Sequence, residues 1–213
     1  MPKSRFAELD ALVASDAALR EELISRGELF GGYHPEMEAL QTEHGKKLES
    51  LIDEFGWPDA AIDGEAACKN AWLIVMHAIS LPSLQRKVLA QCKKNPSGCT
   101  PARLAMLEDR TLVFSGKKQK FGTQFDWDAN GELRPFPIGD EGNVDSRRTI
   151  GGLPSLEETA AQLRARASSE GDKPPANLAG YTRRREEWML RVGWINDRSE
   201  INLAYSAYRP GAS

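Results

Sequence analysis

The sequence has few cysteines, no long apolar run and no excess of basic residues, and each shortage excludes a class of protein. Cys68, Cys92 and Cys99 are the three cysteines in 213 residues, an odd and irregularly spaced set that favours a reducing compartment over a disulfide framework. The longest apolar run, residues 71–79, is interrupted by His77 and is far shorter than the ~20 residues that span a bilayer. The 28 basic and 31 acidic residues leave a net charge of −3, which provides no basic surface for nucleic acid.

Sequence motifs for export, cofactors and metals are also missing. The start of the chain has no apolar signal core, so we expect a cytoplasmic protein without membrane association. No nucleophile elbow, phosphate loop or dinucleotide fingerprint occurs, so no cofactor is predicted. His34 and His44 lack the spacing of a helical zinc pair, and Cys92 and Cys99 lack that of a zinc knuckle. The sequence therefore predicts no metal site.

The composition is that of an ordinary soluble protein with a core. Hydrophobic residues make up 40% and charged residues 28% of the chain, and a chain of this length buries roughly 70% of its unfolded surface. We expect a single globular domain over residues 1–165. Glycine and proline at residues 171–175 indicate a linker at 166–182, followed by a C-terminal helix and tail at 183–213.

Most of the chain shows helical periodicity. Apolar residues predict an amphipathic helix that ends near Gly27 and a second helix that Gly56 ends. Residues 65–79 are almost uniformly apolar and predict a central buried helix. The remaining helix signals are prolines and capping patterns at Pro82, Thr100-Pro101 and Ser155, and an apolar pattern over 183–192. A loop is expected at 59–64, and a loosely held tail beyond Asn196.

The periodicity changes after Gly116. Residues 119–127 alternate loosely, Asn130-Gly131 is a strong turn signal, and residues 133–138 complete a β-hairpin whose prolines mark an edge strand. The predicted fold is therefore mainly α with a small β-hairpin (α+β), with helices packed around the central buried helix.

His77 is the first candidate for chemistry. A lone imidazole in an apolar helix must satisfy its ring nitrogens, so His77 is either a general acid or base, or a core histidine that donates to a backbone carbonyl. Asp109 and Arg110 follow at the end of a later helix, where they either pair with each other or hold a charged ligand.

Polar residues of the hairpin form a second candidate set. Gln119 and Thr123 are expected on one face of a strand and Gln124 on the other, beside Gly122, which permits close approach of a backbone. Such amides either orient a ligand or tie the hairpin to its helices. Asp145 and Arg148 are three residues apart on a predicted short helix, where an i,i+3 ion pair is the structural alternative to ligand binding.

Six ordered motifs resemble a bacterial family catalogued as domain-of-unknown-function family 6624. They run from about residue 30 to 160, and they are GGYHP at 31–35, GWP at 56–58, AWLIVMHA at 71–78, LEDR at 107–110, QKFGTQFDWD at 119–128 and NVDSRR at 143–148. The resemblance implies no activity. It does imply that His77, Asp109, Arg110, Gln119, Thr123, Gln124, Asp145 and Arg148 belong to one set.

The chain departs from the family pattern in three places. Met76 replaces a glutamine before the histidine, Phe121 replaces a tyrosine, and residues 138–142 replace a run with a second proline. Loss of that glutamine puts in doubt any mechanism that needs an amide beside His77.

These patterns lead to one function hypothesis and two alternatives. The first is a small enzyme with a pocket between the central helix and the hairpin, in which His77 and Asp109 are catalytic and the other six residues of the set bind an anionic or carbonyl-bearing substrate. The second is a non-catalytic module that binds a metabolite or peptide. In the third, every polar pair is an internal structural contact.

Overall fold

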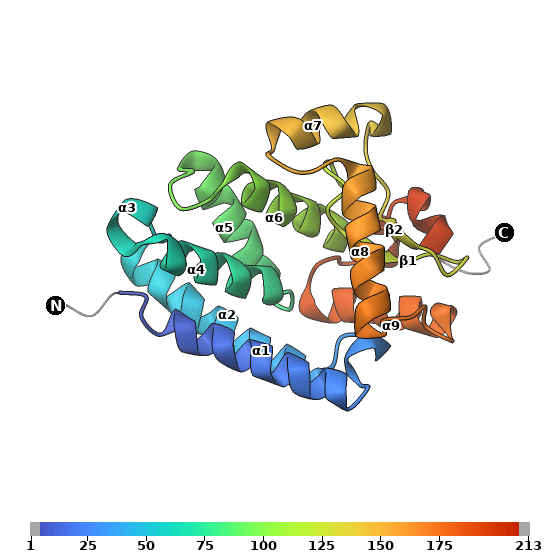
Figure 1. Cartoon of the computed structure of the whole chain (residues 1–213), viewed down its shortest axis with the longest axis horizontal. Helices are drawn as coiled ribbons and strands as arrows, with labels where there is room; N and C mark the ends of the chain where they lie inside the picture. The colour runs from blue at the N-terminus through green and yellow to red at the C-terminus, as the bar shows by residue number, and fades with distance from the viewer. Residues whose placement is uncertain (1–4, 209–213) are drawn as a thin grey trace. The chain divides into compact units, whose positions relative to one another are not determined.

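The computed structural model describes residues 5–208 (Figure 1). These residues divide into two compact units. Unit 1 comprises the chain up to Leu29 together with Tyr33–Leu104, and unit 2 comprises Phe30–Gly32 and the chain from Ala105 onward. The predicted fold class is confirmed, because helices dominate and one two-stranded antiparallel sheet accompanies them. Among the residues described, no helix is both long and apolar enough to cross a membrane.

Unit 1 is entirely helical, and most of its helices begin and end where local signals place them. Its elements are α1 (Leu9–Ser25), the short 3-10 helix η1 (Leu29–Gly31, shared with unit 2), α2 (Pro35–Phe55), α3 (Ala60–Asp63), α4 (Glu65–His77), α5 (Pro82–Lys94) and the first part of α6 (Pro101–Phe114). Proline at the first position of α2 supplies a fixed φ angle where no N–H is needed. At the other end, Gly56 takes a φ of 79° and donates its N–H to the carbonyl of Ile52.

The prediction of a loop at residues 59–64 is wrong, because these residues contain the short helix α3. The Asp59 side chain accepts a hydrogen bond from the N–H of Ala61, and this N-cap supports a single helical turn. The predicted central helix also ends two residues early, because Ala78 leaves the helical conformation with a ψ of 51°.

Helix α4 is the centre of unit 1 and packs against α1, α2, α3 and α5. Ala71, Ile74 and Val75 are buried on it, together with Leu48 and Ile52 of α2. Helix α2 packs closely against the end of α4 at Gly45, where there is no room for a side chain. A Cβ atom at Gly45 would lie 2.7 Å from that of Ala78, so α2 passes directly over the residue that follows His77.

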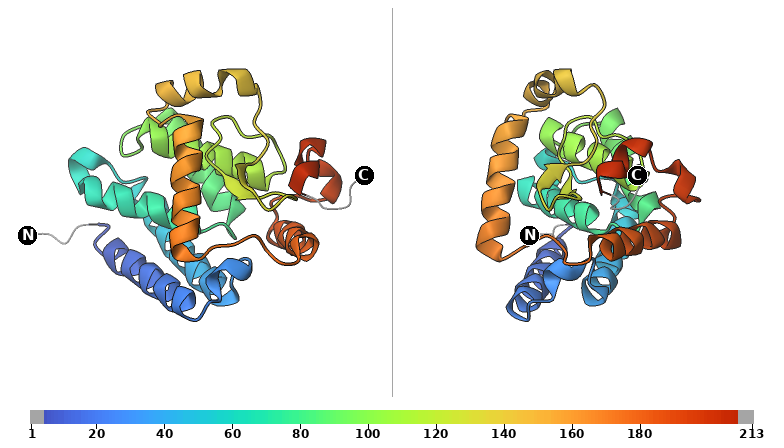
Figure 2. Two further views of the ribbon diagram at one scale, coloured as in Figure 1. Left: turned by 45° about the vertical axis from the view of Figure 1, so that its right-hand side comes forward. Right: turned by 90° about the vertical axis from the view of Figure 1, so that its right-hand side faces the viewer.

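Unit 2 combines a hairpin with helices. After the rest of α6 come β1 (Phe125–Trp127), β2 (Leu133–Pro135), η2 (Glu141–Asn143), α7 (Val144–Ile150), α8 (Leu156–Glu170), α9 (Leu178–Val192), η3 (Arg198–Glu200) and η4 (Leu203–Tyr208). The strands pair antiparallel with Asp126 opposite Arg134, and α8 lies alongside β2 (Figure 2). The capping box at Ser155 and Glu158 is present as predicted.

The hairpin is shorter than the sequence predicted, and the expectation that Gln119 and Thr123 lie on a strand is wrong. Gln119 makes only an isolated parallel bridge to Ile138, and strand β1 begins at Phe125. Gly122 takes a φ of 67°, which no extended strand contains. Residues 119–124 therefore form a bent loop.

The segment beyond Asn196 is packed, so the prediction of a loosely held tail is wrong for residues 197–208. Ile201, Tyr205 and Tyr208 are buried. The hydroxyl of Tyr208 donates to the carbonyl of Pro135 at 2.6 Å, which fastens η4 to the hairpin. Residues 209–213 lie outside the described part of the chain, and the predicted division at 166–182 stays a prediction.

Candidate functional site

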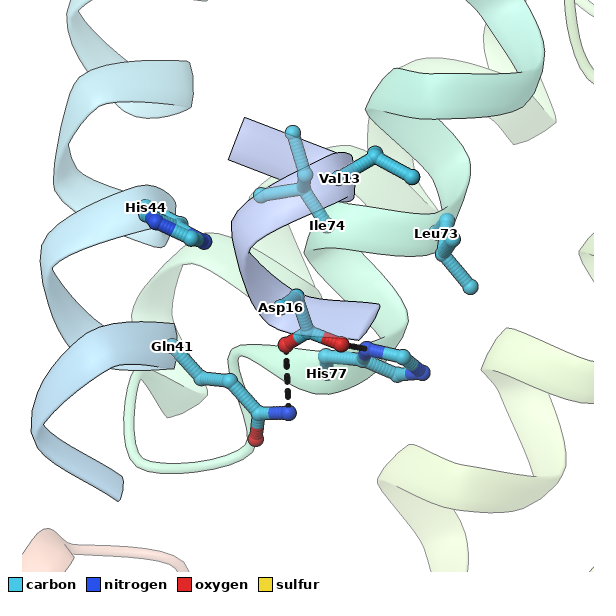
Figure 3. Close-up of a pocket in the computed structure, with 7 residues that line it drawn as sticks. All are labelled: Val13, Asp16, Gln41, His44, Leu73, Ile74 and His77. Atoms are coloured by element: carbon cyan, nitrogen blue, oxygen red, sulfur yellow. Dashed lines mark hydrogen bonds and ion pairs between the residues drawn. The ribbon is translucent and has the colours of Figure 1, made fainter. Parts of the chain in front are cut away.

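His77 is paired with a buried carboxylate of α1 (Figure 3). Its Nδ1 lies 2.9 Å from Oδ2 of Asp16, and 33% of the His77 side chain is exposed compared with 9% of the Asp16 side chain. The partner is thus a carboxylate and not the backbone carbonyl of the alternative interpretation. Because a carboxylate only accepts hydrogen bonds, Nδ1 carries the ring proton and the lone pair of a neutral His77 is on Nε2.

Two further side chains fix the orientation of Asp16. Gln41 of α2 donates its Nε2 to Oδ1 of Asp16 at 2.7 Å. The hydroxyl of Tyr33 donates to Oε1 of Gln41 at 2.8 Å, so the amide cannot be reversed without losing a hydrogen bond. A continuous chain of hydrogen bonds therefore leads from Tyr33 to His77.

The surroundings keep Asp16 ionised. Burial raises the pKa of the Asp16 carboxyl, but the hydrogen bond and charge of His77, with the hydrogen bond of Gln41, outweigh burial and leave this pKa below its ordinary value. An anion thus faces Nδ1 of His77 near neutral pH.

His44 lies next to this group, and burial lowers its pKa. Its Nε2 is 3.3 Å from Oγ of Ser15, whose own proton is donated to the carbonyl of Leu12. The hydroxyl of Ser15 must then accept from His44, so Nε2 carries the proton of this ring.

Only a very small cavity lies between these side chains. Its volume is about 10 Å³, and Val13, Leu73 and Ile74 line it together with Asp16, Gln41, His44 and His77. A cavity of this size holds about one water molecule. Any larger reactant must therefore reach His77 at its exposed edge.

The remaining predicted site residues lie in unit 2, where Asp109 is central. It is fully buried and accepts hydrogen bonds from the N–H groups of Lys120 (2.7 Å), Phe121 (3.1 Å) and Thr123 (3.0 Å) and from the hydroxyl of Thr123 (3.0 Å). Burial raises the pKa of Asp109 more than these hydrogen bonds lower it. The carboxylate holds the bent loop in place.

Gln119 and Gln124 close the same loop. The Nε2 of Gln119 donates to the carbonyls of Gln124 (3.0 Å) and Phe136 (2.8 Å), and its Oε1 accepts from the N–H of Gln124 (2.9 Å). The side chain of Gln124 accepts from Nε of Arg110 at 3.0 Å and donates to Oγ1 of Thr123 at 3.1 Å. Gln119 is fully buried, whereas Arg110 and Gln124 are partly exposed.

Arg148 is 1% exposed and is bonded to the loop and its surroundings. Nε donates to the carbonyl of Pro154 at 2.6 Å, Nη1 to that of Phe121 at 2.6 Å, and Nη2 to the hydroxyl of Thr159. The expected i,i+3 pair is present at its limit, with 4.0 Å between Arg148 and Asp145. Oδ1 of Asp145 accepts from the N–H of Leu156.

The predicted set is thus divided between the two units. Asp109, Arg110, Gln119, Thr123, Gln124 and Arg148 are brought together around the loop at 119–124 of unit 2, with Asp145 beside Arg148. His77 belongs to unit 1, and the pocket predicted between the central helix and the hairpin stays a prediction. Sequence reasoning missed Asp16 and Gln41, although Asp16 follows Leu12 by four residues and so occupies the buried stripe of its helix.

Comparison with known protein families identifies the family of this chain. The family of unknown function DUF6624 matches residues 5–169, which is more than half of the chain. The protein belongs to the DUF6624 family. This confirms the resemblance seen in the motifs, while the bacterial origin stays a prediction. Neither the curated proteins nor the solved structures include a match to this chain.

The three positions at which the sequence is expected to depart from the DUF6624 pattern have known locations in the structure. Met76 is buried in unit 1, and Phe121 contacts Asp109 through its backbone N–H, so that contact does not depend on the aromatic ring. Residues 138–142 include Asp140, which accepts from Arg147 at 3.1 Å. Among residues 5–208, no cluster of three or more histidine, cysteine or acidic side chains has the geometry of a metal site.

Proposed function

We propose that this DUF6624 protein is an enzyme in which His77 transfers a proton to or from a small anionic or carbonyl-bearing substrate. The observation that supports the proposal is the Asp16–His77 pair, in which a buried carboxylate binds Nδ1 at 2.9 Å while a third of the imidazole is exposed. A histidine with one nitrogen fixed and the other available is the usual arrangement of a general base.

In this pair, neutral His77 is the base, and Asp16 stabilises the imidazolium ion that forms when His77 takes up a proton. In the resting state Nε2 holds a lone pair and accepts the substrate proton. The imidazolium ion that results lies against the Asp16 carboxylate, which lowers the cost of the positive charge. Gln41 and Tyr33 keep that carboxylate in one orientation, so the ring does not need to reorganise during transfer.

The size of the neighbouring cavity restricts where the reaction takes place. Because the cavity behind His77 has a volume of about 10 Å³, the substrate does not enter it. The acidic C–H or O–H group is instead presented to the exposed edge of the ring. A small substrate with an accessible acidic proton meets this requirement.

The unit 2 residues have different parts in this proposal. Arg110 and Gln124 are partly exposed and bonded to each other, and we assign them, with Thr123 and Asp145 at the margin, to binding an anionic or carbonyl group at unit 2 itself. The polar atoms of Asp109, Gln119 and Arg148 are engaged with backbone groups and neighbouring side chains. Their part is to keep the loop at 119–124 in shape.

The test is solvent exchange catalysed by the protein. Purified protein is incubated in D₂O with pyruvate or acetoacetate, and loss of the proton signal next to the carbonyl is followed by NMR. We expect exchange above the buffer rate with the wild type, and a loss of at least about 100-fold with His77→Ala, because general base catalysis typically contributes 10²–10⁴-fold. Equal exchange rates for the two proteins would remove His77 from the mechanism.

His34→Asn is a suitable control for that experiment. It removes another of the three histidines and leaves a residue that caps a helix as well as the native one does, at the position where Nδ1 of His34 accepts from the N–H of Glu36. This variant should exchange substrate protons at the wild-type rate. Circular dichroism of each variant separates loss of catalysis from loss of fold.

A second function, the binding of a metabolite or peptide without catalysis, is favoured by an open hollow of unit 2. Its volume of about 550 Å³ falls in the range of ligand sites. Phe136, Ile138, Leu156 and Tyr208 supply apolar surface, and Arg164 supplies charge. A ligand of this hollow should raise the melting temperature of the wild type but not that of Ala160→Trp, which fills the hollow.

A further inference from the structure

Buried aromatic and aliphatic side chains line the open hollow of unit 2. The hollow has a volume of about 550 Å³, and Phe136, Ile138 and Tyr208 line it and are each buried. The ring centroids of Phe136 and Tyr208 lie 4.9 Å apart, and the hydroxyl of Tyr208 donates to the carbonyl of Pro135 at 2.6 Å. An apolar surface with two fixed aromatic rings is therefore present before any ligand binds.

The edge of strand β2 at this hollow offers few backbone groups to a further strand. The carbonyl of Leu133 accepts from Nε of Arg164 at 3.2 Å, and the carbonyl of Pro135 accepts from Tyr208. Pro135 and Pro137, which also line the hollow, have no N–H to donate. Because a peptide that adds to a sheet edge needs such backbone groups, the hollow favours a compact ligand over an extended chain.

Acidic side chains outnumber basic ones around the hollow. The charged residues of its lining are Asp128, Glu141, Asp145 and Glu157, with Arg134 and Arg164. Both arginines are engaged within the protein, since Nη1 of Arg134 lies 3.7 Å from Oδ2 of Asp128 and Arg164 donates to a backbone carbonyl. Glu141 and Glu157 are exposed, and within residues 5–208 neither forms an ion pair. The net charge beside the apolar surface is therefore negative.

We propose that this hollow binds a small organic cation, in which an ammonium group is attached to an apolar body. The inference rests on the second proposed function, ligand binding in the hollow, and names the class of ligand. The apolar body packs against Phe136, Ile138 and Tyr208, while Glu141 and Glu157 attract the charge. Carboxylates and the faces of aromatic rings both attract a cation, whereas an anionic ligand would be repelled by the carboxylates.

The test compares three probes that share a benzyl group and differ in charge. They are benzyltrimethylammonium, benzyl alcohol and phenylacetate, and each is titrated into the ¹⁵N-labelled full chain while the NMR shifts of the amides are recorded. We expect benzyltrimethylammonium to shift amides of β2, α8 and η4 and to bind at least about tenfold more tightly than benzyl alcohol, because aromatic faces attract a cation. Phenylacetate should bind more weakly than benzyl alcohol.

Neutralising the two exposed carboxylates tests the role of charge. Glu141→Gln combined with Glu157→Gln should weaken the binding of benzyltrimethylammonium about fivefold and leave that of benzyl alcohol unchanged. Glu21→Gln combined with Glu54→Gln is the matched control, because both side chains are exposed in unit 1 and the net charge changes by the same amount. This control should bind all three probes like the wild type. Equal weakening in the two double variants would overturn the proposal, because only the overall charge would then matter.

Ala160→Trp separates this inference from ligand binding in general, because it fills the hollow, and its amide spectrum shows whether it is folded. Equal affinities for the three probes, all lost in this variant, would overturn the cation inference and leave ligand binding in the hollow intact. A cation that binds Ala160→Trp as it binds the wild type occupies another place on the protein, which also overturns the inference.

If no probe shifts the amides of the wild type, the cation inference is wrong. The melting-temperature test of the hollow then decides the second function by itself. His77→Ala should bind the three probes like the wild type, because His77 belongs to unit 1. The result is therefore independent of the proposed proton transfer.

Discussion

At the scale of single residues, the orientation of each polar group near His77 depends on the next. Tyr33 donates to the Gln41 oxygen, so the Gln41 nitrogen faces Asp16, and the second Asp16 oxygen faces Nδ1 of His77. The amide of Gln41 could present either its oxygen or its nitrogen, and the hydroxyl of Tyr33 removes that choice, whereas the carboxylate of Asp16 only accepts. Asp16 therefore sets the tautomer of His77, and Gln41 holds Asp16 in place.

Asp16→Asn tests this dependence. Gln41 still donates to the oxygen at position 16, so the new amide nitrogen faces Nδ1 and donates to it. The ring proton then moves to Nε2, and the lone pair that accepts the substrate proton is lost. We expect ¹⁵N NMR to show the Nδ1–H tautomer in the wild type and the Nε2–H tautomer in the variant, with exchange activity reduced by about 10⁴-fold, as for the corresponding substitution in serine proteases. An unchanged tautomer would contradict the assigned role of Gln41.

The same pair makes stability depend on pH in the acid range. Because the folded state lowers the pKa of Asp16, the ionised carboxylate contributes stability above its unfolded pKa of about 3.9, and this contribution is lost as the pH falls through the lower folded value. Urea unfolding should give the wild type a higher free energy of unfolding than Asp16→Asn at pH 7, and a smaller difference between the two proteins at pH 3. A difference that increases in acid would show that folding raises the pKa of Asp16 instead of lowering it.

At the scale of elements, the loop at 119–124 is held by side chains because it has no ladder of its own. Asp109 alone accepts from three backbone N–H groups and one hydroxyl. Asp109→Asn turns half of that acceptor into a donor and leaves buried N–H groups without partners, so we expect a loss of about 3 kcal/mol in the free energy of unfolding. Thr123→Val removes only one hydroxyl and should cost about 1 kcal/mol. Equal losses in urea unfolding would contradict the central position of Asp109.

Gly122 is the second requirement of this loop. Its φ of 67° is unfavourable for other residues, and a Cβ atom there would lie 2.8 Å from Cδ1 of Ile138 and of Leu156. Gly171→Ala provides a control, because Gly171 has a φ of 73° but no neighbouring atom within 4 Å. We expect Gly171→Ala to lower the free energy of unfolding by about 1 kcal/mol and Gly122→Ala by about 2 kcal/mol. Thermal or urea unfolding measures the difference. Identical losses of unfolding free energy for the two variants would mean that the loop at 119–124 can accommodate the extra Cβ atom without strain.

The elements that the sequence predicted well are those with local signals. Helices α5 and α6 begin at Pro82 and Pro101, as predicted from these prolines, and α2 ends before Gly56. Asp16 and the bent loop were missed for a different reason. The partner of Asp16 is 61 residues away in the sequence, and the carboxylate that bends the loop lies on another element, so no window of neighbouring residues contains either contact.

At the scale of the whole molecule, each unit has its own buried core. Leu9, Leu48 and Val88 are fully or almost fully buried in unit 1, and Leu107 and Ile195 in unit 2. Each unit also has the size of a small independent domain. Helix α6 belongs to both, because the boundary falls between Leu104 and Ala105. The short segment Phe30–Gly32 also belongs to unit 2. We expect the opening of one core alone to cost less free energy than the opening of both cores.

Hydrogen exchange measured by mass spectrometry tests this expectation with one destabilising variant in each unit. Leu48→Ala leaves a cavity in unit 1 that costs about 2 to 5 kcal/mol, and Asp109→Asn acts in unit 2. We expect Leu48→Ala to speed exchange in α1, α2 and α4 while the hairpin and α8 keep their protection, and Asp109→Asn to do the reverse, with α6 affected by both. If either variant lowers protection equally over residues 5–208, the two cores unfold as one, because a local loss of packing would then raise the population of a single open state.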